Sequence, residues 1–177
     1  MASPQDVLDY IRSRFHLSGE VQMHKLLYYS QAWHMVWNGR PLFSEPIEAW
    51  RMGPVVPSLR FALGIPRMNE PQLTQVEMAA IDDVLRHYGV HYGWTLSERT
   101  HQELPWVVTR GDLPASANSD REIPRRLIRS FYTEQSMRGE GPTKTETARV
   151  VAGDDEVLAA ARRNQERWKG ALDLLAQ

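Results

Sequence analysis

Two histidines, His87 and His91, are four residues apart in the sequence. On a helix this spacing places both imidazoles on one face, which suits a pair of metal ligands. The zinc-protease version of the pair has a glutamate directly after the first histidine, and this chain has Tyr88 there. Gly89 lies between the two histidines, where we expect the helix to end. We therefore predict no metal at this pair, and no other cofactor.

A second set of residues has the chemistry of an acid–base site. His24, His34 and His101 would form such a site if the fold brought them together with Glu48 or Glu103. Distance along the chain neither supports nor excludes that arrangement. His34 falls on the apolar face of a predicted helix, where a hydrogen-bonded core histidine is commoner than a catalyst. Because the sequence does not exclude such a cluster, a small metal-dependent or acid–base hydrolase remains an alternative function.

Other catalytic and binding motifs are missing from the sequence. It has no glycine-rich phosphate loop and no nucleophile-elbow motif. It has no cysteine, which excludes disulfides and thiol catalysis and fits a reducing compartment. The basic cluster at residues 125–129 is offset by acids elsewhere, and the net charge is −1, so we expect no direct nucleic-acid binding. Without a signal sequence or a run of about 18 apolar residues, the chain is expected in the cytoplasm, off the membrane.

The longest apolar stretch predicts a helix over about residues 22–38. At about 100° per residue, Met23, Leu26 and Trp33 fall on one face. Tyrosines and other apolar residues cover most of the remaining surface, and a helix of this kind is normally buried. Gly39 suits the left-handed residue that ends a helix. We therefore expect a buried central helix with the other elements packed around it.

Helix-start signals mark several further helices. Ser3 followed by Pro4 predicts an N-cap and the first helical residue. The capping-box spacing at Thr74 and Glu77 predicts a second helix start. The same spacing in residues 95–98 and in residues 119–122 predicts two more. The fold class predicted is mainly α, a compact helical bundle with at most a small β-hairpin or extended arm near residues 42–52.

The sequence divides into three predicted parts. Residues 1–133 carry the helical patterns and are expected to form one domain. Residues 134–153 are polar and contain glycine and proline, which is typical of a linker. Residues 154–177 predict an amphipathic helix. A tethered helix of this kind can fold back on its own domain or bind in the groove of a partner.

An ordered series of motifs runs through the predicted domain. In chain order they are Lys25 to His34, Gly39 to Phe43, Pro46 to Trp50, Gly53 to Pro57, Tyr88-Gly89, Trp94 to Ser97 and Thr100 to Trp106. Taken together, over about residues 5–133, they resemble the Panacea antitoxin-domain family, also called SocA-like or phage-associated GepA-like proteins. The resemblance is specific because all of these motifs occur in the same order; any one of them alone would not be specific.

The resemblance implies a compact helical domain that acts as the antitoxin of a toxin–antitoxin pair. Such an antitoxin is not an enzyme; it neutralises a growth-inhibiting toxin, usually encoded next to it, by direct protein–protein binding. One branch of the family instead acts as a proteolytic adaptor that delivers its toxin to a ClpXP-type protease, and this mechanism is the alternative. The family has no established catalytic residues, so none is transferred to this chain.

Two groups of residues follow as candidates. The motif residues are interpreted as determinants of the fold, with tryptophans filling the core and polar groups satisfying buried backbone. They are Lys25, Tyr28, Trp33, Arg40, Trp50, Gly53, Pro54, Trp94, His101 and Trp106. Contacts with the toxin are expected from large side chains of the last helix, since such anchors dominate interfaces. These are Leu158, Arg162, Trp168, Leu172 and Leu175.

Overall fold

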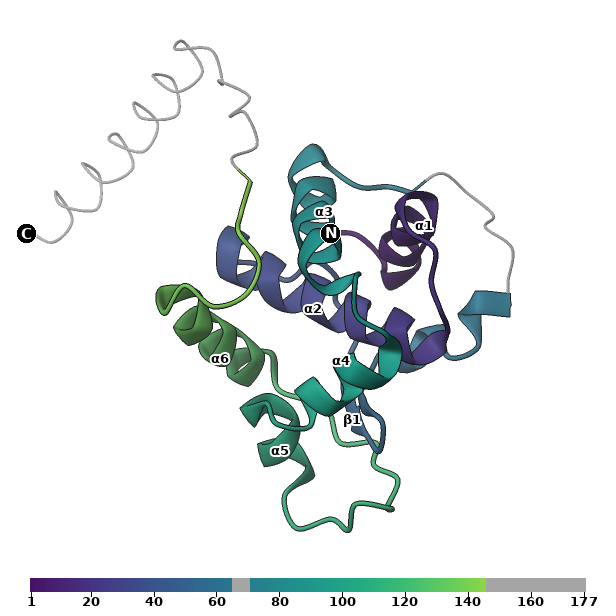
Figure 1. Cartoon of the computed structure of the whole chain (residues 1–177), viewed down its shortest axis with the longest axis vertical. Coiled ribbons are helices and arrows are strands. Elements are labelled where there is room, and N and C mark those ends of the chain that lie inside the picture. The colour runs from purple at the N-terminus through teal and green to yellow at the C-terminus, as the bar shows by residue number, and fades with distance from the viewer. Residues whose placement is uncertain (65–70, 146–177) are drawn as a thin grey trace, which may run out of the picture. The chain divides into compact units, whose positions relative to one another are not determined.

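The central helix α2 (Glu20–Asn38) is the element around which the fold is built. In the computed structural model, which describes residues 1–64 and 71–145, most of the other helices pack along its sides (Figure 1). Every residue of α2 from Met23 to Met35 is buried. Gly39 ends the helix with a φ of 71°, and its N–H donates to the carbonyl of Met35. The predicted helical fold around a buried central helix is confirmed.

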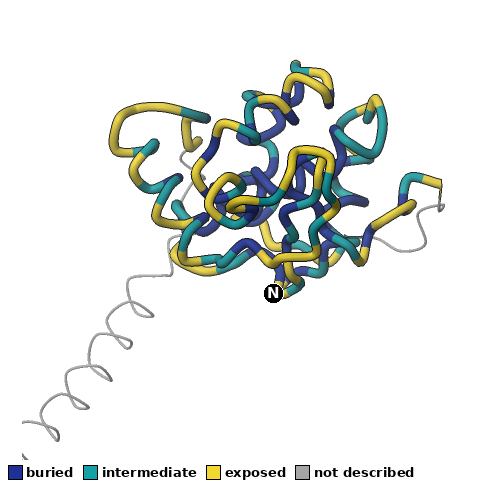
Figure 2. The backbone as a smooth tube through the Cα atoms, turned by 90° about the horizontal axis from the view of Figure 1, so that it is seen from below, coloured by how far each residue is buried: buried dark blue, intermediate teal, exposed yellow. Residues whose placement is uncertain are grey.

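The remaining helices are short and lie around α2. They are α1 (Pro4–Arg14), α3 (Gln75–Tyr88), α4 (Gly93–Thr100), α5 (Leu104–Arg110) and α6 (Arg125–Met137). Helices α1, α3, α4 and α6 contact α2, whereas α5 packs against α6. Buried backbone gathers in the middle of the unit (Figure 2). The caps predicted at Ser3 and Thr74 both form, each reinforced by the acid three residues later.

A small hairpin joins β1 (Glu48–Trp50) to β2 (Gly53–Val55), with Trp50 paired opposite Gly53. It ends later in the chain than the arm expected near residues 42–52. Two 3-10 turns, Pro57–Leu59 and Ala62–Gly64, follow it. The far side of β1 is also bonded, because the Ala49 N–H donates to the Arg121 carbonyl at 2.9 Å. Residues just before α6 therefore run beside β1.

Two predicted capping boxes are wrong. Helix α4 begins at Gly93, before residues 95–98, and a β-carbon at residue 93 would be 2.7 Å from the backbone nitrogen of Gln22. Its start is therefore determined by close packing on α2. Residues 119–122 are not helical. They lie beside β1 in space, and α6 begins only at Arg125. In both places tertiary contacts outweigh the local capping pattern.

The compact unit spans Met1–Thr145, so it extends beyond the boundary predicted at residue 133. Helix α6 continues to Met137, and the chain after it contacts α2 and α3. Gly141 contacts the ring of Trp33, and the Thr145 hydroxyl donates to Asp83 at 2.6 Å. The described part of the predicted linker thus packs on the helical unit, and the predicted helix 154–177 lies outside the described residues. Within the described ranges, no helix is long and apolar enough to cross a membrane.

Candidate partner-binding surface

Three motif residues meet beneath the β1–β2 hairpin. The Lys25 ammonium is buried and donates to the Pro54 carbonyl at 3.2 Å. A β-carbon at Gly53 would be 2.5 Å from Lys25 Cε and 2.6 Å from Thr100 Oγ1, and the φ of 97° also favours glycine. Burial lowers the pKa of Lys25 to about 7. These contacts fix the hairpin to α2.

A second group of residues, from the end of α4 and from α5, holds the hairpin. The Trp106 indole N–H donates to the Trp50 carbonyl at 2.9 Å. The ring of His101 stacks on Trp106 with 4.2 Å between centroids, and the Arg110 guanidinium lies 5.1 Å from the Trp106 centroid. The hairpin is therefore held in place from more than one side.

The other motif residues have different surroundings. Tyr28 and Trp33 are fully buried, and the Trp33 indole donates to the Tyr88 hydroxyl at 3.1 Å. Arg40 is exposed and forms an ion pair with the buried Glu77 at 3.6 Å. Trp94 is 63% exposed. The expectation that the tryptophans fill the core therefore fails for Trp94, which presents its ring to solvent.

Glu103, one of the acid–base candidates, is buried among tyrosines. Its two carboxylate oxygens accept hydrogen bonds from Tyr29 at 3.2 Å and Tyr132 at 2.5 Å. Arg99 lies 3.7 Å away. Burial raises the pKa of Glu103 to about 7, against the effect of these partners. The carboxylate therefore bonds α2 to α6 across the core.

The candidate histidines each have neighbours of their own. His24 accepts a hydrogen bond from the Val56 N–H at 3.4 Å, and burial lowers its pKa to about 4. His34 lies 2.9 Å from the Arg40 carbonyl, and burial lowers its pKa as well. Helix α3 ends at Tyr88, so His91 lies beyond the helix that contains His87. Within residues 1–64 and 71–145, no group of three or more possible ligands could hold a metal.

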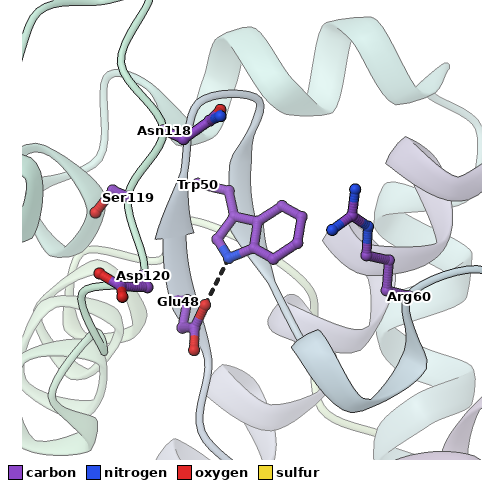
Figure 3. A pocket seen from close by; sticks show the side chains of 6 residues that line it. All are labelled: Glu48, Trp50, Arg60, Asn118, Ser119 and Asp120. Atoms are coloured by element: carbon purple, nitrogen blue, oxygen red, sulfur yellow. Dashed lines mark hydrogen bonds between the residues drawn. The ribbon is translucent and has the colours of Figure 1, made fainter.

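The structure has a concave feature at the hairpin and another between helices α5 and α6. The first, here called the Trp50 pocket, has a volume of about 430 Å³. Its walls are Glu48, Trp50, Arg60, Asn118, Ser119 and Asp120. Figure 3 shows the indole of Trp50 in the middle, with Glu48 and Asp120 on one side and Arg60 on the other. The indole N–H donates to Glu48 at 2.6 Å.

The second feature, here called the α5–α6 groove, has a volume of about 680 Å³. Its walls are Val108, Thr109, Arg121, Glu122, Pro124, Arg126, Leu127 and Ser130. Beside it, α5 exposes Leu104 by 51%, Val107 by 44% and Val108 by 55%. Exposed apolar side chains that lie together, rimmed by polar residues, are typical of interaction sites.

One stretch of chain forms a wall of both features. Residues 118–120 line the Trp50 pocket, and the next two, Arg121 and Glu122, line the α5–α6 groove. The backbone of this stretch is bonded to β1, and the Arg121 guanidinium donates to the Arg110 carbonyl at 2.9 Å. We call residues 118–122 the partition.

Neither feature was predicted from the sequence. The partner contacts predicted on the last helix, from Leu158 to Leu175, lie outside the described residues. A signal for the groove was present, because Leu104, Val107 and Val108 are crowded into one short segment. A helix of this length that also carries Trp106 has more apolar side chains than one buried face can take.

Comparison with known proteins gives one match. The model of a family described as the antitoxin SocA-like, Panacea domain matches residues 23–107, from α2 into α5. No curated protein and no solved structure matches the chain. The match is shorter than the range of 5–133 expected from the motifs. Over residues 23–107 the predicted resemblance is confirmed, and this part of the chain is similar to the Panacea domain of SocA-like antitoxins.

Proposed function

We propose that the chain is the antitoxin of a toxin–antitoxin pair and that it neutralises its toxin by direct binding at the α5–α6 groove. The observation that carries the proposal is the exposed apolar side of α5, with Val108 55% exposed at the edge of the groove. The similarity of residues 23–107 to an antitoxin domain supports the role. Most apolar groups of the unit are buried, so an apolar helix side open to solvent calls for a partner.

Charge at the groove indicates what the toxin presents. Arg121 and Arg126 line the groove together with a single acid, Glu122. Arg129 follows Arg126 by three residues on α6, which places it on the same side of the helix. A toxin segment with an apolar anchor and acidic neighbours would complement these groups and would be steered toward them.

The mechanism we propose is occlusion. A bound antitoxin covers the active site of the toxin or the entry of its substrate, so the antitoxin itself needs no catalytic group. Toxin and antitoxin would meet in the cytoplasm, where a chain without cysteine has no need of disulfides.

The test is protection of cells that express the adjacent toxin gene. Val108→Glu places an acid in the groove, where it would repel an acidic toxin segment. Val90→Glu makes the same change at a valine that is 75% exposed outside the groove. We expect Val108→Glu to lose protection, to weaken toxin binding in calorimetry by at least about tenfold, and to keep its melting temperature, while Val90→Glu keeps both functions. Equal behaviour of the two variants would remove the groove as the site, and a wild-type chain that neither binds the toxin nor protects would remove the antitoxin role.

A second variant tests the contacts proposed for the last helix. We propose that Leu158, Trp168 and Leu172 add to the toxin interface. Truncation after Thr145 tests this, because it keeps the bond between Thr145 and Asp83 and so leaves the helical unit complete. Reduced toxin affinity with an unchanged unfolding midpoint supports the contacts, and full affinity excludes them.

A further inference from the structure

We infer that the Trp50 pocket is a receptor for the guanidinium of an arginine side chain that the toxin presents. The inference rests on the proposed function for its partner, but the binding chemistry belongs to the pocket alone. Two carboxylates, an aromatic ring and a cavity of about 430 Å³ meet at this one place.

The two carboxylates of the pocket belong to Glu48 and Asp120. Among the described residues, no ion pair involves Glu48 or Asp120. Glu48 accepts the indole N–H of Trp50, and Asp120 lies on the same side of the ring as Glu48, on a neighbouring segment of the chain (Figure 3). Two acids that line one cavity from different segments attract a cation.

The ring of Trp50 favours arginine over other cations. A planar guanidinium can stack on an indole and at the same time donate two hydrogen bonds to a carboxylate, whereas an ammonium does so less well. Arg60 of the chain itself already lies 5.1 Å from the ring centroid. In Figure 3 it lies on the side of the ring away from Glu48 and Asp120, so its guanidinium does not occupy the acidic side of the pocket.

The pocket is held in shape before a ligand arrives. Arg110 is 3% exposed and donates to the carbonyls of Pro114 at 2.8 Å and Ala117 at 2.9 Å. It therefore anchors the loop that leads into Asn118 and Asp120. The partition is bonded to β1 at its other end. A preformed site of this kind loses little conformational entropy on binding.

The pocket also continues the surface proposed for the toxin. The partition lines the pocket with residues 118–120 and lines the α5–α6 groove with Arg121 and Glu122. The two sites differ in charge: the pocket carries two acids and Arg60, and the groove carries two arginines and one acid. A toxin that covers the partition would place an acidic, apolar segment on one side and an arginine on the other.

The test uses the full chain, labelled with ¹⁵N, and no toxin. The probe is the capped tripeptide acetyl-Gly-Arg-Gly-amide, and its neutral isostere with citrulline in place of arginine is the control. We expect the arginine peptide to shift the indole N–H resonance of Trp50 in a saturable way, while the citrulline peptide leaves it unchanged. Asp120→Asn should weaken this binding by about tenfold or more, because a charge-assisted hydrogen bond is lost.

The matched variant is Asp112→Asn, which removes an exposed acid of the same loop that does not line the pocket. It should bind the arginine peptide as the wild type does. Equal shifts with the citrulline peptide, a shift that does not saturate, or equal effects of Asp112→Asn and Asp120→Asn would each overturn the inference. If the titration fails while Val108→Glu still abolishes protection, the pocket is excluded and the proposed antitoxin function stands.

Discussion

Gly141 packs directly against the indole of Trp33, and a β-carbon at residue 141 would collide with the ring. Gly139 has a similar backbone conformation, with a φ of 72° against 92°, but a β-carbon there would meet nothing within 4 Å. We therefore expect Gly141→Ala to lower the free energy of unfolding by about 2–4 kcal/mol, since overpacking adds to backbone strain. Gly139→Ala should cost only about 1 kcal/mol. Urea denaturation measures both, and equal losses would contradict the contact with Trp33.

The hairpin offers a second matched pair of glycines. A β-carbon at Gly53 would lie 2.5 Å from Lys25 Cε, whereas one at Gly39 would meet nothing within 4 Å. Both residues have positive φ, 97° at Gly53 and 71° at Gly39, so each variant also pays for a backbone conformation that disfavours a side chain. Gly53→Ala should lose about 3 kcal/mol or more, and Gly39→Ala about 1 kcal/mol. A Gly53→Ala protein as stable as Gly39→Ala would show that Lys25 and Thr100 can both move aside without cost.

The buried carboxylate of Glu103 predicts a pH dependence of stability. Its pKa is raised from 4.5 to about 7 by burial, so the folded protein binds a proton that the unfolded chain releases. The contribution to stability is therefore complete below pH 4.5 and is lost as the pH rises to 7. Across that window, we expect the stability of the wild type relative to Glu103→Gln to fall by on the order of 2 kcal/mol.

Urea denaturation of both proteins at several pH values gives this difference. The histidines with lowered pKa values, such as His24, also titrate near this window, but they are common to both proteins and cancel. Lys25, with a pKa of about 7, contributes mainly above it. A difference that stays constant or rises with pH would mean that Glu103 is charged in the folded protein throughout.

Electrostatic steering toward the α5–α6 groove can be measured at Arg126. Arg126→Gln should lower the association rate with the toxin by about threefold to tenfold at low salt, and the effect should shrink as salt is added. The control is Arg14→Gln on α1, which removes an arginine whose side chain is 57% exposed and lies outside the groove. Stopped-flow mixing gives both rates. Equal rates for the two variants would mean that the toxin does not approach the groove through acidic residues.

The parts of the fold that could be predicted are those fixed by local chemistry. Ser3 and Thr74 cap their helices because their partners are three residues away, and α2 is buried because it is apolar on nearly every side. The helix caps expected in residues 95–98 and 119–122 do not form, because residues far away in the sequence determine the structure of these two segments. Gly93 packs on Gln22, and the Arg121 carbonyl bonds β1. No local pattern reveals those partners.

The two concave surface features could not be predicted from the sequence. The Trp50 pocket joins β1 to residues 118–120, and the α5–α6 groove joins Val108 to Leu127, so each needs a tertiary contact to exist. The burial of Glu103 against Tyr29 and Tyr132 depends in the same way on the packing of α6 on α2. Motif residues such as Lys25 and Trp106 could be identified, but their common purpose, which is to hold the hairpin, becomes visible only in three dimensions.

The partition is one run of backbone with a concave site on each side, and this has a consequence for recognition. The gap between the two sites is set by main-chain hydrogen bonds to β1, not by side chains that can rotate. We expect a toxin that fills both sites to carry its acidic segment and its arginine at one fixed separation. A foreign toxin that carries the same two features at another separation would bind only one of the two sites. The fixed length of residues 118–122 would therefore let the chain distinguish its own toxin from related toxins.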